Sequence, residues 1–400
     1  MRIQTIADIH IGNHLRFARG TMEAGINRRG RLVLDAFGHV LQHELDEPDA
    51  FFIAGDLYDE VRPEPQLLAA GMRLLGDSIE WHNNPEPPTS IIVGNHEQAS
   101  NLEGDHALGV FSRMARVVEK PQAYLEEGKQ DEAGVLVWAL PYRTDLRPQE
   151  YIESALAEME NRFDITTDYA DAILLAHFGV EDQRTPPWLK GGHGSIHADV
   201  LHEIAAKAGI SCVLAGDWHE HRSWRYDDGI EIVQIGALVP TGFDNPSNVA
   251  QLHPDRDPYG SVITWDNSKP KGKRCSRSVV QGPRFVKTKS SAEVEAALDE
   301  ASDYGHELFV QVTASADAVT AMTRHIEELQ ARTTMPFHFE VVADHADVRR
   351  RIESAAISAK DAETTERAIA EYVFEMPLDE DLDPQEVNRL AQGFSKGGEA

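Results

Sequence analysis

Five short polar clusters between residues 8 and 219 carry side chains that could ligate metal ions. They are Asp8-Ile9-His10, Gly55-Asp56-Leu57-Tyr58-Asp59, Gly94-Asn95-His96-Glu97, the single His177, and Gly216-Asp217-Trp218-His219. Carboxylate, amide and imidazole donors in this mixture suit Mn²⁺, Fe²⁺, Zn²⁺ or Mg²⁺. A thiolate site would need clustered cysteines, whereas Cys212 and Cys275 form no CxxC pair. The clusters therefore predict a site for hard or borderline divalent metal ions.

Each cluster directly follows a short apolar run of strand length. Such runs are Arg2–Ala7, Ala50–Ala54, Ser90–Val93, Val135–Leu140, Ala172–Ala176, Ser211–Ala215 and Glu231–Ile235. Helical stretches lie between several of them, at Arg31–Leu45, Gln66–Trp81, Pro148–Arg162 and Ala198–Ala208. This order predicts an α/β fold in which layered sheets are buried between helices. Because the carboxyl ends of strands carry the chemistry in such folds, we expect the five clusters to meet in one crevice.

Three of the candidate ligands, Asp56, Asn95 and Asp217, follow a glycine. Glycine permits a tight turn at the end of a strand, which would aim the next side chain into the shared crevice. A single DxH or GNH motif occurs by chance. The evidence for a metal site is therefore the ordered set of all five clusters.

The ordered set resembles the calcineurin-like metallophosphoesterase superfamily, whose pattern is D-x-H, G-D, G-N-H-[DE], a single H, and G-H-x-H. All five blocks occur in that order within about residues 1–240. Within the superfamily, the blocks and the later Ile235-Gly236 resemble the SbcD-type nuclease subunit of DNA double-strand-break repair complexes, and the related recombination endonuclease subunit of tailed phages. The resemblance implies a layered sandwich of two sheets flanked by helices.

The last block departs from the family pattern, because Asp217 stands where the first histidine of G-H-x-H is expected. An alternative register would use His219 and His221 as the H-x-H pair. We favour Asp217 and His219, because Gly216 closes the strand at the family's spacing and aspartate is a competent ligand.

Carried over by position, the resemblance implies a two-metal site. Asp8, His10, Asp56 and His219 would hold one ion, and Asp56, Asn95, His177 and Asp217 the other. His96 would be the catalytic residue, stabilising the charged phosphoryl group or protonating the leaving oxygen. Asp59 and Glu97 could orient metal-bound imidazoles or be ordinary loop acids. We expect Mn²⁺, with Mg²⁺ as the alternative.

The domain organisation is predicted from composition and from the resemblance. We expect a metallophosphoesterase (nuclease) domain at 1–265, a basic linker at 266–283, a small α/β capping domain at 284–343 and a helical tail at 344–400. The linker is assigned because it has lysines and arginines among Pro, Ser and Gly without apolar periodicity. In the tail, apolar stripes in Thr365–Met376 and after Asp383 predict two short amphipathic helices, which could fold back or bind a partner.

The composition limits location and binding mode. The chain has 67 acidic and 38 basic residues, a net charge of −29, so a nucleic acid would be held by local basic patches or metal ions. No apolar run approaches the roughly 20 residues that cross a bilayer, and no signal-peptide pattern is seen. We expect no membrane association and a cytoplasmic protein, nucleoid-associated or in a phage-infected cell.

Three classes of function compete at this stage. The leading hypothesis is a metal-dependent DNA endo- or exonuclease working in repair or recombination with an SbcC-type coiled-coil ATPase, which the family binds through C-terminal helices. The second is a metallophosphatase or phosphodiesterase acting on small molecules or phosphoproteins, since fold does not fix substrate. The third is a scaffold with a degenerate site, against which His96 argues. The family also implies a homodimer formed through Arg31–Leu45 and Gln66–Trp81.

Overall fold

The computed structural model describes residues 1–14, 22–45, 48–81, 89–98, 106–127, 134–143, 145–162, 169–185, 190, 194–240, 242–243 and 259–344. The chain divides into two compact units. The larger comprises Met1–Asn245 and Pro254–Gly282, and the described part of the smaller runs from Pro283 to Asp344.

The first sheet of the larger unit has six strands in the order β14-β13-β1-β2-β3-β4. Their bounds are β1 Arg2–Ile6, β2 Ala50–Ile53, β3 Thr89–Ile92, β4 Arg116–Val118, β13 Ser261–Asp266 and β14 Cys275–Val279. β1, β2 and β3 are parallel neighbours, so their C-terminal ends lie at the same edge of the sheet. These central strands are buried, which is why they appear in the sequence as continuous apolar runs.

The second sheet has the order β11-β12-β10-β7-β6-β5. Its strands are β5 Gln122–Glu126, β6 Val135–Leu140, β7 Asp171–His177, β10 Cys212–Gly216, β11 Arg222–Arg225 and β12 Glu231–Gln234. β7 and β10 are parallel, and Gly216 pairs with His177 at their ends. A short pair, β8 Gly179–Glu181 and β9 Ser195–His197, lies apart from both sheets.

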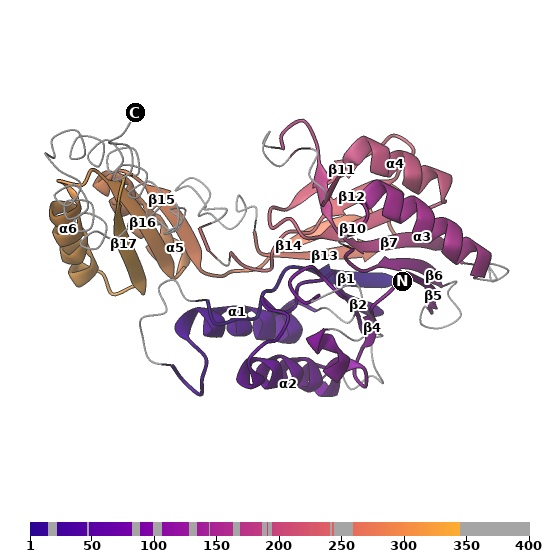
Figure 1. Cartoon of the computed structure of the whole chain (residues 1–400), viewed down its shortest axis with the longest axis horizontal. Helices are drawn as coiled ribbons and strands as arrows, with labels where there is room; N and C mark the ends of the chain where they lie inside the picture. The colour runs from indigo at the N-terminus through magenta and orange to yellow at the C-terminus, as the bar shows by residue number, and fades with distance from the viewer. Residues whose placement is uncertain are drawn as a thin grey trace, which may run out of the picture. The chain divides into compact units, whose positions relative to one another are not determined.

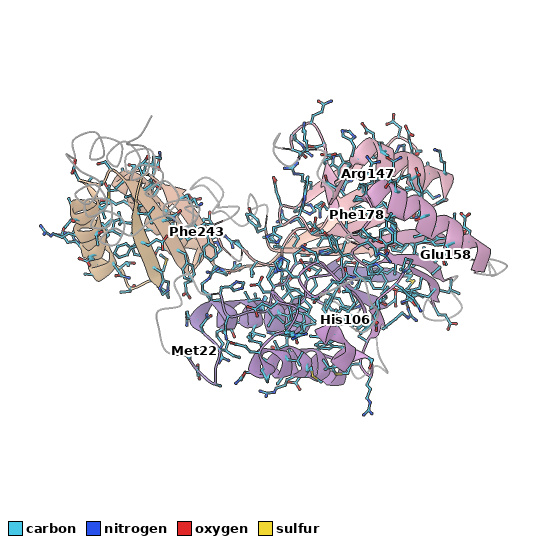
Figure 2. The ribbon with its side chains drawn as sticks, in the orientation of Figure 1. Met22, His106, Arg147, Glu158, Phe178 and Phe243 are labelled. Atoms are coloured by element: carbon cyan, nitrogen blue, oxygen red, sulfur yellow. The ribbon has the colours of Figure 1, made fainter. Side chains whose placement is uncertain are left out.

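Helices cover the outer faces of the two sheets (Figure 1). They are α1 Arg28–His39 with a π-helical extension η1 Val40–Glu44, α2 Pro65–Trp81, the 3₁₀ helix η2 Ala107–Phe111, α3 Pro148–Arg162 and α4 Ala198–Lys207. α1 and α2 pack on the first sheet, and α3 and α4 pack on the second, where Phe178 joins their core (Figure 2). A third core, including Phe52, Leu214 and Trp265, fills the space between the sheets. The predicted layered α/β sandwich is confirmed.

The smaller unit is a three-stranded parallel sheet, β15-β16-β17, with two helices. Its elements are β15 Arg284–Thr288, α5 Ser291–Tyr304, β16 Leu308–Ala314, α6 Val319–Arg332 and β17 Phe337–Ala343. Val294 of α5 and Ile326 of α6 are fully buried in one core with Val310 of β16. The order strand, helix, strand, helix, strand is the one that the sequence predicts for 284–343.

The segment expected as a basic linker, 266–283, lies almost entirely within the larger unit and contains an edge strand of the first sheet. Cys275–Val279 forms the edge strand β14, antiparallel to β13, with Ile263 opposite Arg277. The linker interpretation is therefore wrong. The alternation of polar and half-buried residues along Cys-Ser-Arg-Ser-Val suits an edge strand, but it lacks the apolar run by which the other strands were recognised.

Two further expectations concern the C-terminal tail and membrane-spanning helices. The predicted helical tail, 344–400, lies outside the described residues apart from Asp344. Among the helices that are described, none combines the length and the apolar character needed to cross a bilayer.

Candidate metal centre

The ends of strands from both sheets meet at one place in the larger unit. Nδ1 of His177, at the end of β7, donates to the carbonyl oxygen of Ala54, just after β2, at 2.8 Å. The backbone N–H of Asp217, after β10, donates to Oδ1 of Asp8, after β1, at 2.9 Å. The two sheets are thus joined by hydrogen bonds at the site itself.

The backbone at this junction is strained. Asp8, His10 and Asp56 have φ of 50°, 52° and 52°, and Asp217 has φ of 90°. Ala24 is the other non-glycine residue with positive φ in the described part of the chain. Such left-handed conformations cost free energy and persist where the surroundings impose them, commonly at functional sites. Four of the eight sequence-predicted site residues are held in this way.

The glycines that precede candidate ligands serve two different purposes. Gly55 has a φ of +90°, the tight turn that the sequence predicts. Gly94 and Gly216 are needed for close packing: a Cβ on Gly94 would collide with Oδ1 of Asp56, and one on Gly216 with the carbonyl oxygen of Ala54. All three glycines therefore allow the ligand-bearing turns to approach one another.

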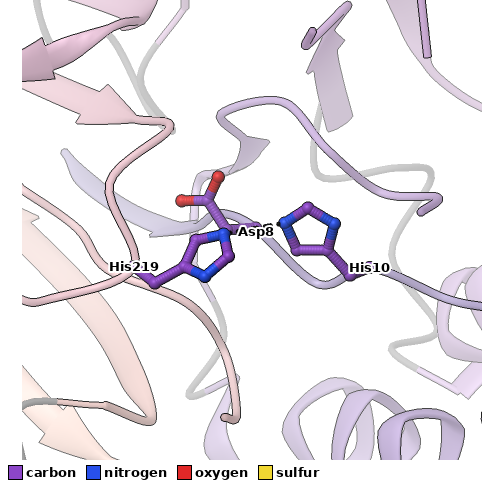
Figure 3. Close-up of side chains that lie close together, drawn as sticks. All are labelled: Asp8, His10 and His219. Atoms are coloured by element: carbon purple, nitrogen blue, oxygen red, sulfur yellow. Dashed lines mark hydrogen bonds between the residues drawn. The ribbon is translucent and has the colours of Figure 1, made fainter. Parts of the chain in front are cut away.

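A first group of donors consists of Asp8, His10 and His219, whose ligand atoms lie within 4.8 Å of one another. The Nε2 atoms of His10 and His219 point toward each other beside the Asp8 carboxylate, 3.0 Å apart, and the two rings are inclined at 65° (Figure 3). Nδ1 of His10 lies 3.0 Å from Oδ1 of Asp59. An ionised carboxylate accepts hydrogen bonds and cannot donate them. Nδ1 therefore carries the proton, and in the neutral ring the lone pair of Nε2 faces the group. This arrangement fits a divalent metal ion.

A second group consists of Asp8, Asp56 and His177, again within 4.8 Å. Nε2 of His177 lies 2.8 Å from Oδ1 of Asn95, 3.4 Å from Oδ2 of Asp56 and 3.9 Å from Oδ1 of Asp217. Because Nδ1 of His177 is bonded to a backbone carbonyl, Nε2 is the atom that faces these oxygens. Oδ2 of Asp56 is also 3.7 Å from Nε2 of His10, so this carboxylate lies between the two groups.

The electrostatics of the site favour cations. Burial raises the pKa of Asp8 to about 7 and that of Asp217 to about 6. Burial alone would also raise the pKa of Asp56, but His177 and His10 outweigh it and keep that pKa below its ordinary value. Several carboxylates removed from water in one place are costly without compensating positive charge. Divalent ions would supply that charge, so the donor set and its surroundings fit two metals.

His96 differs from the candidate ligands in its exposure. Its backbone N–H donates to Oδ1 of Asp56 at 3.0 Å, and its ring packs edge-on against that of His10 with centroids 4.6 Å apart. Its side chain is 41% exposed, whereas those of His10 and His177 are buried. Its ligand atom also lies within 4.8 Å of those of His10 and Asp56, so the imidazole stands at the solvent-exposed edge of the donor groups.

The two acids considered as partners of imidazoles behave differently. Asp59 does contact His10, as described above. Glu97 is fully buried, and among the described residues its carboxylate forms no hydrogen bond with an imidazole: its two oxygens accept from the backbone N–H groups of Tyr58 and Gly94, each at 3.0 Å. It therefore ties the turn after β2 to the turn after β3, and its suggested role as an imidazole partner is wrong.

His14 is a further residue at the site, which the sequence patterns do not single out. Its ring is largely buried, with Nδ1 3.3 Å from Oδ2 of Asp59, and burial lowers its pKa to about 4. Its position four residues after His10 was the available signal. His221, the alternative ligand, is in neither donor group: its Nδ1 donates to the carbonyl oxygen of Ile235 at 3.2 Å. His219 belongs to the first donor group, and Asp217, which is in none of the groups within 4.8 Å, has its Oδ1 3.9 Å from Nε2 of His177.

Residues 1–221, more than half of the chain, match the family model described as calcineurin-like phosphoesterase. Among curated proteins, the chain is similar to the DNA double-strand break repair protein Mre11 of Methanocaldococcus jannaschii, with 21% identity over 224 residues, covering 56% of this chain and 54% of that protein. It is also similar to a subunit of the nuclease SbcCD of Staphylococcus epidermidis, with 28% identity over 206 residues, covering 46% and 48%. The chain thus spans about half the length of the curated relatives it matches.

Solved structures with a similar fold include a putative 5'-nucleotidase from Staphylococcus aureus, in complex with alpha-ketoglutarate. The identity is 14% and the TM-score 0.41, over 75% of this chain and 58% of the other.

Proposed function

Because this chain belongs to the calcineurin-like phosphoesterase family, we propose that it is a two-metal DNA nuclease, the hydrolytic subunit of a repair or recombination complex. The observation that carries the proposal is the position of Asp56, whose Oδ2 lies 3.7 Å from Nε2 of His10 and 3.4 Å from Nε2 of His177. A carboxylate between two sets of imidazole and oxygen donors suits a bridging ligand of a metal pair.

In this proposal the donors divide as the family resemblance implies. Asp8, His10, Asp56 and His219 would hold one ion, and Asp56, Asn95, His177 and Asp217 the other. When bound, two divalent ions lower the pKa of water and neutralise the charge of a phosphodiester. Mn²⁺ is the expected metal and Mg²⁺ the alternative, because both accept oxygen-rich ligand sets.

His96 would act on the substrate rather than on the metals. Its Nδ1 lies 2.9 Å from the carbonyl oxygen of Asp59, an atom that can only accept, so Nδ1 carries a proton. Nε2 is then the nitrogen left for the substrate, and when the ring carries a proton on both nitrogens it can donate to a leaving oxygen or to the charged phosphoryl group. The partial exposure of this side chain allows such contact.

DNA is proposed as the substrate, with support from the two curated relatives, which are named as a DNA double-strand break repair protein and as part of a nuclease. We also propose a coiled-coil ATPase as partner, bound by the C-terminal region, and a homodimer formed through α1 and α2. A chain truncated after Lys360 should keep its metals and intrinsic activity but no longer co-purify with the ATPase. Light scattering at micromolar concentration should show a dimer, and a strict monomer would contradict that part.

The test of the main proposal is a substrate panel. Purified protein with Mn²⁺, Mg²⁺ or EDTA is incubated with linear double-stranded DNA, single-stranded DNA, bis-p-nitrophenyl phosphate and p-nitrophenyl phosphate. We expect metal-dependent cleavage of DNA and of the diester. An Asp56→Asn protein prepared in parallel reveals any contaminating nuclease. Rapid hydrolysis of the monoester with no cleavage of DNA would replace the nuclease by a phosphatase.

A further inference from the structure

A second polar cavity lies in the larger unit, between the edge strands β11 and β14 of the two sheets. It has a volume of about 180 Å³. Its polar lining includes His221, Ser223, Arg225, Glu231, Ser276 and Arg277. We call this cavity the edge groove. None of the residues proposed as metal ligands lines it, although His221 follows the candidate ligand His219 by two positions.

Arg225 reaches the edge groove from β11. Its Nε lies 3.3 Å from Oε1 of Glu231, the residue opposite it on β12, and a terminal nitrogen donates to the carbonyl oxygen of Cys275 at 3.3 Å. The side chain is still 57% exposed, and a guanidinium has five N–H donors. Two contacts therefore orient this guanidinium without covering it.

Glu231 compensates only part of this positive charge. Its Oε2 also accepts from the backbone N–H groups of Arg274, at 2.8 Å, and Cys275, at 3.2 Å. The carboxylate is thus used to fix the start of β14 against β12. The carboxylate borders the groove, but its side chain is only 2% exposed and is engaged by Arg225 and by these backbone N–H groups.

Arg277 provides the second guanidinium. Its Nε donates to Oγ of Ser261 at 2.7 Å and a terminal nitrogen donates to the carbonyl oxygen of Tyr259 at 2.6 Å. These contacts hold the side chain across β13. Because β14 alternates, Arg277 and Cys275 share one face of the strand, and both line the groove.

Further positive charge stands on the turn between β13 and β14. Lys271 and Lys273 are exposed, and neither forms an ion pair with any residue that the structure describes. This turn contacts the turn between β11 and β12, because a Cβ on Gly229 would lie 2.8 Å from Cβ of Lys271. The turn that carries the two lysines therefore lies next to the turn that follows β11.

We propose that the edge groove and the adjoining lysines bind phosphate groups of a nucleic-acid backbone. Two oriented guanidiniums suit phosphate oxygens, and a serine hydroxyl such as that of Ser223 is a common contact to the nucleic-acid backbone. In a chain with a net charge of −29, such a local cluster is where a polyanion can be held. The inference rests on the proposed function in taking DNA as the polyanion.

The test measures binding separately from cleavage. Anisotropy of a fluorescent DNA duplex is recorded in EDTA over a series of salt concentrations, for the full chain and for two variants, Lys271→Glu/Lys273→Glu and Arg225→Gln. A charge-matched control, Arg113→Glu/Lys207→Glu, changes one exposed residue just after η2 and one on α4. Thermal melting checks folding, and hydrolysis of bis-p-nitrophenyl phosphate with Mn²⁺ checks the metal centre.

We expect the double variant to bind DNA about tenfold more weakly or worse, with the slope of log affinity against log salt reduced by about one for each cation removed. Arg225→Gln should lower that slope by about one, and the control should match the parent. Diester hydrolysis should be unchanged in all of them. The proposed phosphate site would be contradicted if the parent and both groove variants bound DNA equally. It would also be contradicted if the control lost as much affinity as the variants, or if the parent did not bind DNA. Failure of the nuclease proposal would appear separately, as Mn²⁺-dependent ester hydrolysis without DNA cleavage.

Discussion

Asp59 contacts the imidazole of His96 through two atoms. Its carbonyl oxygen lies 2.9 Å from Nδ1 of His96, and its Oδ1 lies 3.5 Å from the same nitrogen. The carbonyl fixes the proton on Nδ1, and the carboxylate lies beside that nitrogen at a longer distance. His96 is thereby held with Nε2 available, the arrangement that a proton donor needs.

Replacing His96 by Ala should leave two metals bound and reduce kcat by at least about 10²-fold, the scale of a lost general acid or charge stabiliser. Metal content is measured by mass spectrometry and rates with bis-p-nitrophenyl phosphate at saturating Mn²⁺. Unchanged activity in this variant would remove His96 from the mechanism. Loss of a metal would make it a structural support instead.

Asp59→Asn separates two functions of one residue. The charge that faces Nδ1 of His10 is removed, so metal affinity should fall about 10- to 100-fold, as is usual when the partner of a metal-bound imidazole is lost. The backbone carbonyl that holds His96 is unchanged, so the rate at saturating metal should stay within a few-fold of the parent. A titration of rate against Mn²⁺ gives both quantities. If the affinity is unaltered and the maximal rate falls, the contact with His10 has no role in metal binding.

The sequence predicts the central strands and the residues after them because both leave strong local signals. Buried parallel strands are continuous apolar runs, and their ends are the polar clusters that the structure brings together around Asp56. Edge strands leave no such signal: β14 is half-exposed and alternates, so its basic residues were read as a linker. Contacts such as that of His14 with Asp59 depend on where separate turns meet, which local patterns do not encode.

The structural roles of Gly94, Gly216 and Glu97 also depend on contacts between separate strands, which local sequence patterns do not encode. The glycines before Asn95 and Asp217 predict tight turns. In the structure, Gly94 and Gly216 are required because atoms that follow another strand approach them closely. Glu97 directly follows the candidate catalytic residue His96, which is why a role in orienting a metal-bound imidazole was considered for it. Its side chain instead joins two turns, a relationship that becomes visible only when β2 and β3 are side by side.

Glu97→Gln should therefore destabilise the fold near the site. Both carboxylate oxygens accept backbone N–H groups, from Tyr58 and Gly94, and an amide would place N–H donors against one of them. The expected loss is about 1–3 kcal/mol of unfolding free energy, since a buried donor is left without an acceptor. Urea unfolding in EDTA measures it without the contribution of bound metal. Glu153→Gln, on the exposed face of α3, is the matched control and should be neutral.

The last prediction concerns which residue completes the second metal group. Oδ1 of Asp217 lies 3.9 Å from Nε2 of His177, whereas His221 is bonded to Ile235 and lines the edge groove. Asp217→Ala should therefore bind one equivalent of Mn²⁺ by calorimetry, and His221→Ala should bind two.

Asp217→His should remain active but shift its preference from Mn²⁺ and Mg²⁺ towards Zn²⁺, because a carboxylate is a harder donor than an imidazole. Thermal melting with each metal provides a readout independent of activity. If Asp217→Ala binds two metals normally while His221→Ala loses one, the alternative register with His219 and His221 is correct. In that case Asp217 would serve mainly through its backbone N–H, which donates to Oδ1 of Asp8 at 2.9 Å and would be kept by either substitution.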